Sequence, residues 1–311
     1  MRDTSPPVFL PPDLVSDVGT FAVPGDLWHL PKATFEPIWK RVTGKGIVVA
    51  VLDTGYTPHD LLPKPVYSKS FIRGESISDG NGHGNHCAGT VLARDGVGVA
   101  PDASLMAIKV LSNDGRGSSD GIANGVRDAV DNGADILSLS LGSSSPYEPT
   151  RKSMEYAWSK GVITISAAGN SGFNGRQNTI GYPAKYPESL CIGAYRKDGQ
   201  RASFSSGGRE LDMCCPGQDI WSCDNKSASG FRGMSGTSMA TPWAAGLFAL
   251  IIELMRREGA AAFTGVEAVR AFLAQYTQDQ GEPGFDPFWG MGIPKTQDII
   301  AALVNDQLSF V

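Results

Sequence analysis

Residues 46–55 read GIVVAVLDTG, an unbroken apolar run that ends in the acidic Asp53. Helix-length stretches separate this run from others of the same kind. Continuous apolar strands with helix-length connections indicate a parallel sheet that is covered on both faces. The sequence therefore predicts a three-layer α/β fold with a mostly parallel central sheet and helices on both faces. The other runs are SLMAIKVL at 104–111, ADILSLSLG at 134–142, GVITISAAGN at 161–170 and SLCIGAY at 189–195.

The 311-residue chain divides into a proline-rich start and one folded unit. Residues 1–27 contain five prolines and show neither a helical nor an alternating period, which predicts an extended strap or a short pro-segment. Residues 28–311 show no repeat and no linker, so we expect a single domain.

Composition excludes several classes of function. The net charge of −5 and the scattered basic residues give no footprint for nucleic acid. The chain contains no run of 18 apolar residues, so the sequence predicts no membrane span. The first residues lack the apolar core of a signal peptide. Five cysteines, an odd number, favour a reducing compartment. We therefore expect an intracellular protein unless a leader has been removed; the oligomeric state is not indicated.

Polar residues follow three of the predicted strands. Asp53 ends the first run, Ser140 and Gly142 end the third, and Asn170 ends the fourth. Because ligands of open parallel sheets bind outside the carboxyl ends of the strands, these residues should converge on one edge. A shared site is expected there.

The stretch GHGNHCAGT at 82–90 holds two histidines and a cysteine within five positions. A helical zinc pair needs two histidines four apart with a glutamate between them, whereas His83 and His86 are three apart. A structural zinc site also needs a second close pair of ligands. The stretch is therefore less suited to a metal site than to a catalytic base or to a packed part of the core.

The chain offers each group that a serine hydrolase needs: a nucleophile, a neutral imidazole, a carboxylate and oxyanion donors. Ser238 begins an apolar helix, whose N-terminal amides favour negative charge. Asp53 supplies the carboxylate and His83, between two glycines, supplies the base. Asn170 supplies a side-chain amide donor.

Three long blocks resemble those of the subtilisin superfamily of serine proteases, the subtilases, and most nearly its proteinase K-like branch. They are VVAVLDTG at 48–55, DGNGHGNHCAGTV at 79–91 and GMSGTSMATPWAAG at 233–246. Their Asp, His, Ser order is the subtilisin order. With GMGIPKTQDIIAAL at 290–303, the similarity covers residues 39–303.

The resemblance implies a serine endopeptidase that acts on polypeptides through an acyl-enzyme and needs no cofactor for its chemistry. Asp53, His83 and Ser238 would form the triad, and Asn170 with the Ser238 N–H the oxyanion hole. His86 would be a buried support. A processing enzyme with one narrow substrate and a catalytically silent scaffold remain alternatives, although the four intact residues favour an active enzyme.

The resemblance also implies a cleft in which a peptide lies as an added strand between two edges. Small residues would line the pocket for the side chain before the scissile bond, so we expect broad cleavage after large apolar or aromatic residues. The first edge would comprise Asn113, Asp114, Gly115, Arg116 and Gly117, the second Ser138, Leu139, Ser140, Leu141 and Gly142, and the pocket Ala167, Ala168, Gly169 and Gly181.

Structural calcium is left open. The loop at 93–105 is short compared with the calcium loop of bacterial subtilisins, which argues against their high-affinity site. Asp212 matches a family aspartate that joins backbone carbonyls at 187–190 around a weaker calcium. An aspartate without an ion is the alternative.

Four further features depart from the family or stay open. Cys87 matches a buried free thiol beneath the catalytic histidine, and one disulfide among Cys191, Cys214, Cys215 and Cys223 is an open alternative. Trp243 stands where the family usually has a histidine. Asn85 replaces the usual threonine and should have little effect. The segment PPVFLPP at 6–12 either lies in the cleft, where its prolines resist cleavage, or packs elsewhere as a linker.

Overall fold

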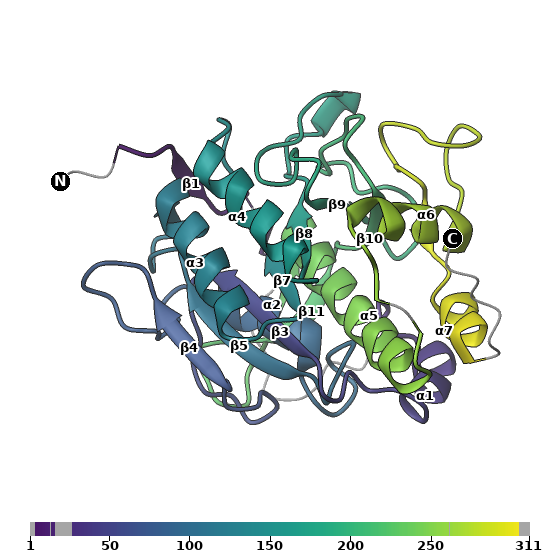
Figure 1. The fold of residues 1–311 in the computed structure, drawn as a ribbon, viewed down its shortest axis with the longest axis horizontal. Helices are drawn as coiled ribbons and strands as arrows, with labels where there is room; N and C mark the ends of the chain where they lie inside the picture. Colours follow the sequence, from purple (N-terminus) through teal and green to yellow (C-terminus); the bar gives the residue numbers. More distant parts are fainter. Residues whose placement is uncertain (1–3, 13, 16–26, 261, 305–311) are drawn as a thin grey trace.

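The computed structural model describes residues 4–12, 14–15, 27–260 and 262–304 (Figure 1). Its centre is a seven-stranded sheet in the order β10-β9-β8-β7-β3-β5-β4, in which every neighbouring pair is parallel. The predicted apolar runs supply five of these strands. The strands are β3 (Val48–Asp53), β4 (Tyr67–Ser70), β5 (Ser104–Lys109), β7 (Ile136–Leu139), β8 (Ile163–Ala167), β9 (Leu190–Tyr195) and β10 (Met213–Pro216).

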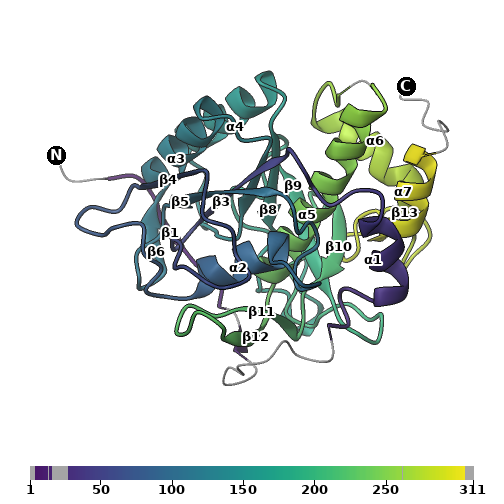
Figure 2. The same cartoon turned by 90° about the horizontal axis from the view of Figure 1, so that it is seen from below.

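Helices cover both faces of this sheet (Figure 2). On one face lie α2 (His83–Leu92) and α5 (Thr237–Arg257), and on the other α3 (Ser119–Asp131) and α4 (Glu148–Ser159). Alternation along β3 separates the two cores, because Val49 and Val51 join the first and Ala50 and Leu52 the second. The predicted three-layer α/β architecture is confirmed.

The helix α5 is the longest of the described helices and runs through the core. It is long and apolar enough to cross a membrane by composition, but 94% of its most apolar window is buried within the protein. It contacts β7, β8, β9 and β10 and packs against α2. Such burial is that of a core helix, which presents its first residues at the edge of the sheet.

Shorter elements complete the fold. Helices α1 (Lys32–Trp39) and α7 (Thr296–Val304) contact each other, and α6 (Val266–Tyr276) leads into the small sheet of β13 (Thr277–Gln278) and β14 (Ile293–Pro294). A hairpin of β11 (Ile220–Cys223) and β12 (Phe231–Ser235) lies against α2. A single 3₁₀ turn, η1, spans Phe173–Gly175.

The proline-rich start of the chain adds strands to two of these elements. β1 (Pro7–Phe9) pairs antiparallel with β6 (Arg116–Ser118), and β2 (Leu14–Val15) pairs antiparallel with β12. Phe9 and Pro12 contact Gly142 and Asn170, which lie just beyond the ends of β7 and β8. The path of this N-terminal segment therefore crosses the expected site.

Candidate active site

His83 and Asp53 form a buried hydrogen-bonded pair. Asp53 is the last residue of β3, and His83 is the first residue of α2. The His83 Nδ1 lies 2.7 Å from the Asp53 Oδ1, and each residue is only 1% exposed. Because Nδ1–H donates to the carboxylate, the neutral ring carries its lone pair on Nε2. That is the tautomer a general base requires.

A second buried carboxylate, which the sequence analysis did not single out, fixes the start of α2. The Asp79 Oδ1 accepts hydrogen bonds from the Gly82 N–H at 2.8 Å and the Thr54 hydroxyl at 2.8 Å. Its Oδ2 accepts from the Asn85 N–H at 2.8 Å. Asp79 thus ties the first turn of α2 to the residue after Asp53. Asp79 stands just before a glycine-rich loop that leads into the helix, and this position in the sequence could have identified it as a capping residue.

Ser238 lies in the first turn of α5 and is fully buried. The Ser140 hydroxyl donates to the Ser238 carbonyl oxygen at 2.8 Å. The Cys87 Sγ lies 3.5 Å from the same oxygen and 4.0 Å from the His83 Nε2. The structure therefore brings Asp53, His83 and Ser238 together around one thiol.

That thiol is a packing group. Cys87 is completely buried in α2, and burial raises its pKa to about 11. It remains protonated at neutral pH, so it lacks the thiolate that a nucleophile or a metal ligand needs. Asp53, His83 and Cys87 offer ligand atoms within 4.8 Å of one another. The protonated thiol and the Nδ1–H bond to Asp53 do not suit a metal.

Asn170 is oriented by the turn that precedes the nucleophile. Its Oδ1 accepts from both the Thr237 N–H and the Thr237 hydroxyl, each at 2.9 Å. The amide nitrogen is therefore turned the other way, where the Nδ2 lies 3.4 Å from the Pro12 carbonyl oxygen. A donor fixed in this way suits an oxygen that gains negative charge.

The chain's own N-terminal segment lies in the expected cleft. Phe9 and Gly142 exchange two backbone hydrogen bonds of 2.9 Å, and the Leu10 N–H donates to the Gly115 carbonyl at 3.0 Å. Val8 is opposite Gly117 in the β1–β6 pair. Val8 is fully buried whereas Phe9 is 46% exposed. The segment thus makes the contacts that an extended peptide would make with both edges.

The remaining residues of the second edge differ in placement. Ser138 and Leu139 lie within β7 with buried side chains, and their place along the cleft stays a prediction. Their side chains alternate between the two faces of a central strand and pack against the covering layers. Leu141 is fully buried in the core beneath the edge. Only Gly142 of this edge bonds to the N-terminal segment in the described structure.

The first edge and the expected pocket are assembled from separate segments. Gly115 and Gly117 pair with the N-terminal segment, while Asn113, Asp114 and Arg116 are exposed around it. The Gly181 N–H donates to the Ala168 carbonyl at 3.3 Å, and Ser143 and Tyr182 exchange two backbone bonds. Gly142, Ala168 and Gly181 therefore belong to adjoining segments. Ala167 is buried at the end of β8 and Gly169 follows it half-exposed.

A fully buried lysine connects the end of β3 to the first edge of the cleft. The sequence patterns did not predict this role. Lys109 is paired with Asp53 in the β3–β5 register. Its Nζ donates to the Thr54 carbonyl and, at 3.0 Å, to the Asn113 Oδ1, and lies 3.2 Å from the Glu75 carboxylate. Lys109 therefore joins the strand that carries Asp53 to the first edge of the cleft. Two of its partners, Thr54 and Glu75, lie far along the chain, so no local pattern marks these contacts.

His86 is a buried support, as expected. Its Nε2–H donates to the Ile220 carbonyl at 3.0 Å and the Arg232 carbonyl at 3.1 Å. Burial lowers its pKa to about 3, so the ring stays neutral. Asn85 does more than expected, because its side chain bonds to both backbone groups of Thr57.

All five cysteines are free and buried, so the open alternative of a disulfide is excluded in this structure. Of the two alternatives left open at Asp212, the contacts favour an aspartate without a calcium ion. The Arg270 Nε donates to the Asp212 Oδ1 at 2.8 Å, and the Cys191 N–H donates to Oδ2 at 2.7 Å. Arg270 also binds the Ser189 carbonyl, at 3.1 Å. A guanidinium among these oxygens would repel a calcium ion, so the residues present do not fit one.

Comparison with known proteins agrees with this geometry. The model of the subtilase family matches residues 44–292. Subtilisin DY of Bacillus licheniformis is 43% identical over 214 residues, which cover 67% of this chain and 77% of that protein. Subtilisin BL of Lederbergia lenta is 44% identical over 68% of this chain and 78% of its own length. M-protease of Shouchella clausii is 44% identical over 68% of this chain and 55% of its own length.

Proposed function

Because this chain belongs to the subtilase family and is a subtilisin-like serine endopeptidase, we propose that it hydrolyses peptide bonds through an acyl-enzyme on Ser238. The observation that carries the proposal is the convergence of His83, Asp53 and Ser238 around Cys87.

In the proposed reaction, the His83 Nε2 removes the proton of the Ser238 hydroxyl as its oxygen attacks the peptide carbonyl. Asp53 holds the ring in the required tautomer and stabilises the imidazolium. The Asn170 Nδ2 and the Ser238 N–H bind the oxyanion. His83 then returns the proton to the leaving amine, and water hydrolyses the acyl-enzyme with His83 again as base.

The proposed substrate is a polypeptide bound as an extended strand. The N-terminal segment marks the path, since its bonds to Gly115 and Gly142 involve backbone groups only and do not depend on sequence. Ala168, Gly169 and Gly181 are small, which supports a preference for large apolar or aromatic residues before the scissile bond. The buried Cys87 thiol supports placement near the proteinase K-like branch, although the relatives named above include two called subtilisins.

We also propose that residues 1–27 inhibit a single peptidase domain formed by residues 28–311. The supporting observation is that the Pro12 carbonyl faces the Asn170 amide while Phe9 and Leu10 hold both edges. A substrate cannot take these positions while the segment occupies them. Pro11 and Pro12 have no N–H and a fixed φ, which hinders the adjustment that cleavage requires. The five free thiols support a reducing compartment.

The function is tested by a serine-directed fluorophosphonate followed by casein digestion. Labelling of the wild type, none of Ser238→Ala, and digestion of casein are expected. Labelling without digestion would indicate a narrow processing enzyme. Absence of labelling after removal of the N-terminal segment would indicate a silent scaffold and would overturn the proposal.

A further inference from the structure

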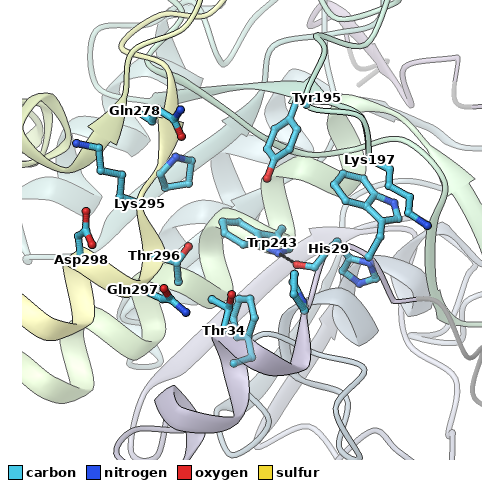
Figure 3. A pocket seen from close by; sticks show the side chains of 15 residues that line it. His29, Thr34, Tyr195, Lys197, Trp243, Gln278, Lys295, Thr296, Gln297 and Asp298 are labelled. Carbon is cyan, nitrogen blue, oxygen red and sulfur yellow. Dashed lines mark hydrogen bonds between the residues drawn. The ribbon is translucent and has the colours of Figure 1, made fainter.

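A second hollow lies away from the triad, where α1, α5, α7 and the end of β9 meet (Figure 3). Its volume is about 500 Å³, within the usual range for small-molecule sites. None of the residues proposed for catalysis lines it. Its aromatic lining consists of Trp28, Phe35, Tyr195 and Trp243, together with the His29 ring.

The aromatic walls are held in place from behind. The Trp243 indole N–H donates to the His29 carbonyl at 2.9 Å, and the Trp28 indole N–H donates to the Gln218 carbonyl at 3.1 Å. Phe35 meets Trp243 edge to face at 6.2 Å, and Trp28 meets Tyr195 at 5.7 Å. Both indoles are thus fixed before any ligand arrives, and a preformed wall reduces the entropy cost of binding. Trp243 is also the residue that replaces the usual histidine of the family.

Two hydroxyl groups that can donate hydrogen bonds are aimed at the hollow. Thr296, the first residue of α7, is only 8% exposed, and its hydroxyl has no hydrogen-bond partner among the described residues. Figure 3 shows this hydroxyl and that of Tyr195 both directed toward the Trp243 indole. The Tyr195 hydroxyl also lacks a partner in the described part of the chain, and burial raises its pKa, so it stays a donor at neutral pH.

The start of α7 adds a positive end to the same wall. The backbone N–H groups of Thr296, Gln297 and Asp298 have no acceptor among the residues that the structure describes. Free amides at a helix N-terminus attract anions. Lys295 and Asp298 both lie at the exposed rim, where solvent screens their opposite charges.

We propose that this hollow binds an aromatic carboxylate, with its ring between the indoles and its carboxylate at the Thr296 and Tyr195 hydroxyls and the α7 amides. The aromatic walls account for the ring, and the Thr296 and Tyr195 hydroxyls with the α7 amides account for the negative charge. Trp243 lies on the same helix as Ser238, so the bound ring contacts the helix that carries the nucleophile.

The test compares phenylacetate with phenylacetamide, which share a ring and differ in charge. Binding to full-length Ser238→Ala protein, which cannot digest itself, is measured by saturation-transfer NMR and by quenching of tryptophan fluorescence. We expect phenylacetate to bind about tenfold more tightly, the size of one hydrogen bond to a charged group. Thr296→Val and Tyr195→Phe should each remove most of that difference.

Thr277→Val is the matched control, because Thr277 is also 8% exposed but its hydroxyl already donates to the Leu273 carbonyl. It should leave the affinity unchanged. Equal affinities for phenylacetate and phenylacetamide would overturn the proposal. So would an affinity unchanged by Thr296→Val, or displacement of phenylacetate by a peptide substrate, which would place binding in the cleft.

Discussion

Individual residues of the site were predictable by type but not by orientation. Block patterns predicted the proposed roles of Asp53, His83, Asn170 and Ser238, because each role needs a particular functional group. The direction of the Asn170 amide is set by Thr237, which is 67 positions away along the chain. Such contacts form only after the sheet assembles, so a linear pattern cannot show them.

Replacement of Asn170 by leucine tests the proposed oxyanion donor. The variant loses the Nδ2 donor, and we expect kcat to fall about a hundredfold or more, the usual loss for one such donor. KM should change little, since the donor acts on charge that develops during reaction. The measurement is peptide hydrolysis by protein freed of its N-terminal segment.

The same variant also removes the bonds from Thr237 to the Asn170 Oδ1. Thr237→Val is the control for that loss, because it removes one of them and keeps the amide donor. A much smaller decrease in kcat is expected from it. Equal decreases in both variants would assign the effect to packing before Ser238 rather than to the donor.

Among the elements, the N-terminal segment was the hardest to place from sequence. Its prolines exclude a helix, but an extended segment without an apolar period fits a linker as well as a cleft. The structure decides between these two placements, because the segment pairs with backbone groups of Gly115, Gly117 and Gly142. These partners lie over a hundred residues beyond it.

Adjacent residues of β1 give a sharp test of inhibition. Val8 is fully buried and Phe9 is 46% exposed, so Val8→Asp should expel the segment while Phe9→Asp should not. Burying an ionised carboxylate costs several kcal/mol, more than the few backbone bonds of the segment supply. We expect Val8→Asp to raise the initial rate of freshly purified full-length enzyme about tenfold or more.

Deletion of residues 1–15 should reproduce the Val8→Asp rate, and mass spectrometry would verify that the compared chains are untrimmed. If Phe9→Asp activates as strongly as Val8→Asp, or if deletion leaves the rate unchanged, the segment does not inhibit.

The helix α2 carries a pH-sensitive support. The pKa of His86 is about 3 in the folded protein, below the ordinary histidine value of 6.5. Between these values the unfolded chain binds a proton that the folded chain does not, so stability falls as pH drops below 6.5. The expected slope from this group approaches about 1.4 kcal/mol per pH unit.

His86→Gln should flatten this dependence, because glutamine can donate to the same carbonyls and does not titrate. The measurement is the free energy of unfolding from pH 7 to pH 4.5, with both proteins carrying Ser238→Ala. Parallel curves for the two proteins would show that His86 does not contribute.

For the whole molecule, the sequence predicted the layers and the site edge but not the interactions that hold distant segments together. Apolar runs specify a parallel sheet because burial on both faces requires them. The sequence left calcium at Asp212 open, because it does not show that Arg270, 58 residues beyond Asp212, supplies a positive charge there. Lys109 was missed because two of its partners, Thr54 and Glu75, lie far from it along the chain. Both interactions join segments that are neighbours only in the folded chain.

The Asp212–Arg270 pair gives the last two predictions, since one guanidinium contacts two acids of different burial. The side chain of Asp212 is 6% exposed and that of Glu267 is 80% exposed. Asp212→Asn leaves the guanidinium without its buried partner, which should cost about 3 kcal/mol of unfolding free energy. Glu267→Gln should cost less than about 0.5 kcal/mol, because the exposed pair is screened.

Because the Arg270 guanidinium occupies the position that a cation would take, EDTA should leave the unfolding temperature of the Ser238→Ala protein with its Asp212–Arg270 pair intact unchanged. A marked decrease with EDTA, reversed by calcium, would show that an ion rather than the guanidinium holds these segments together.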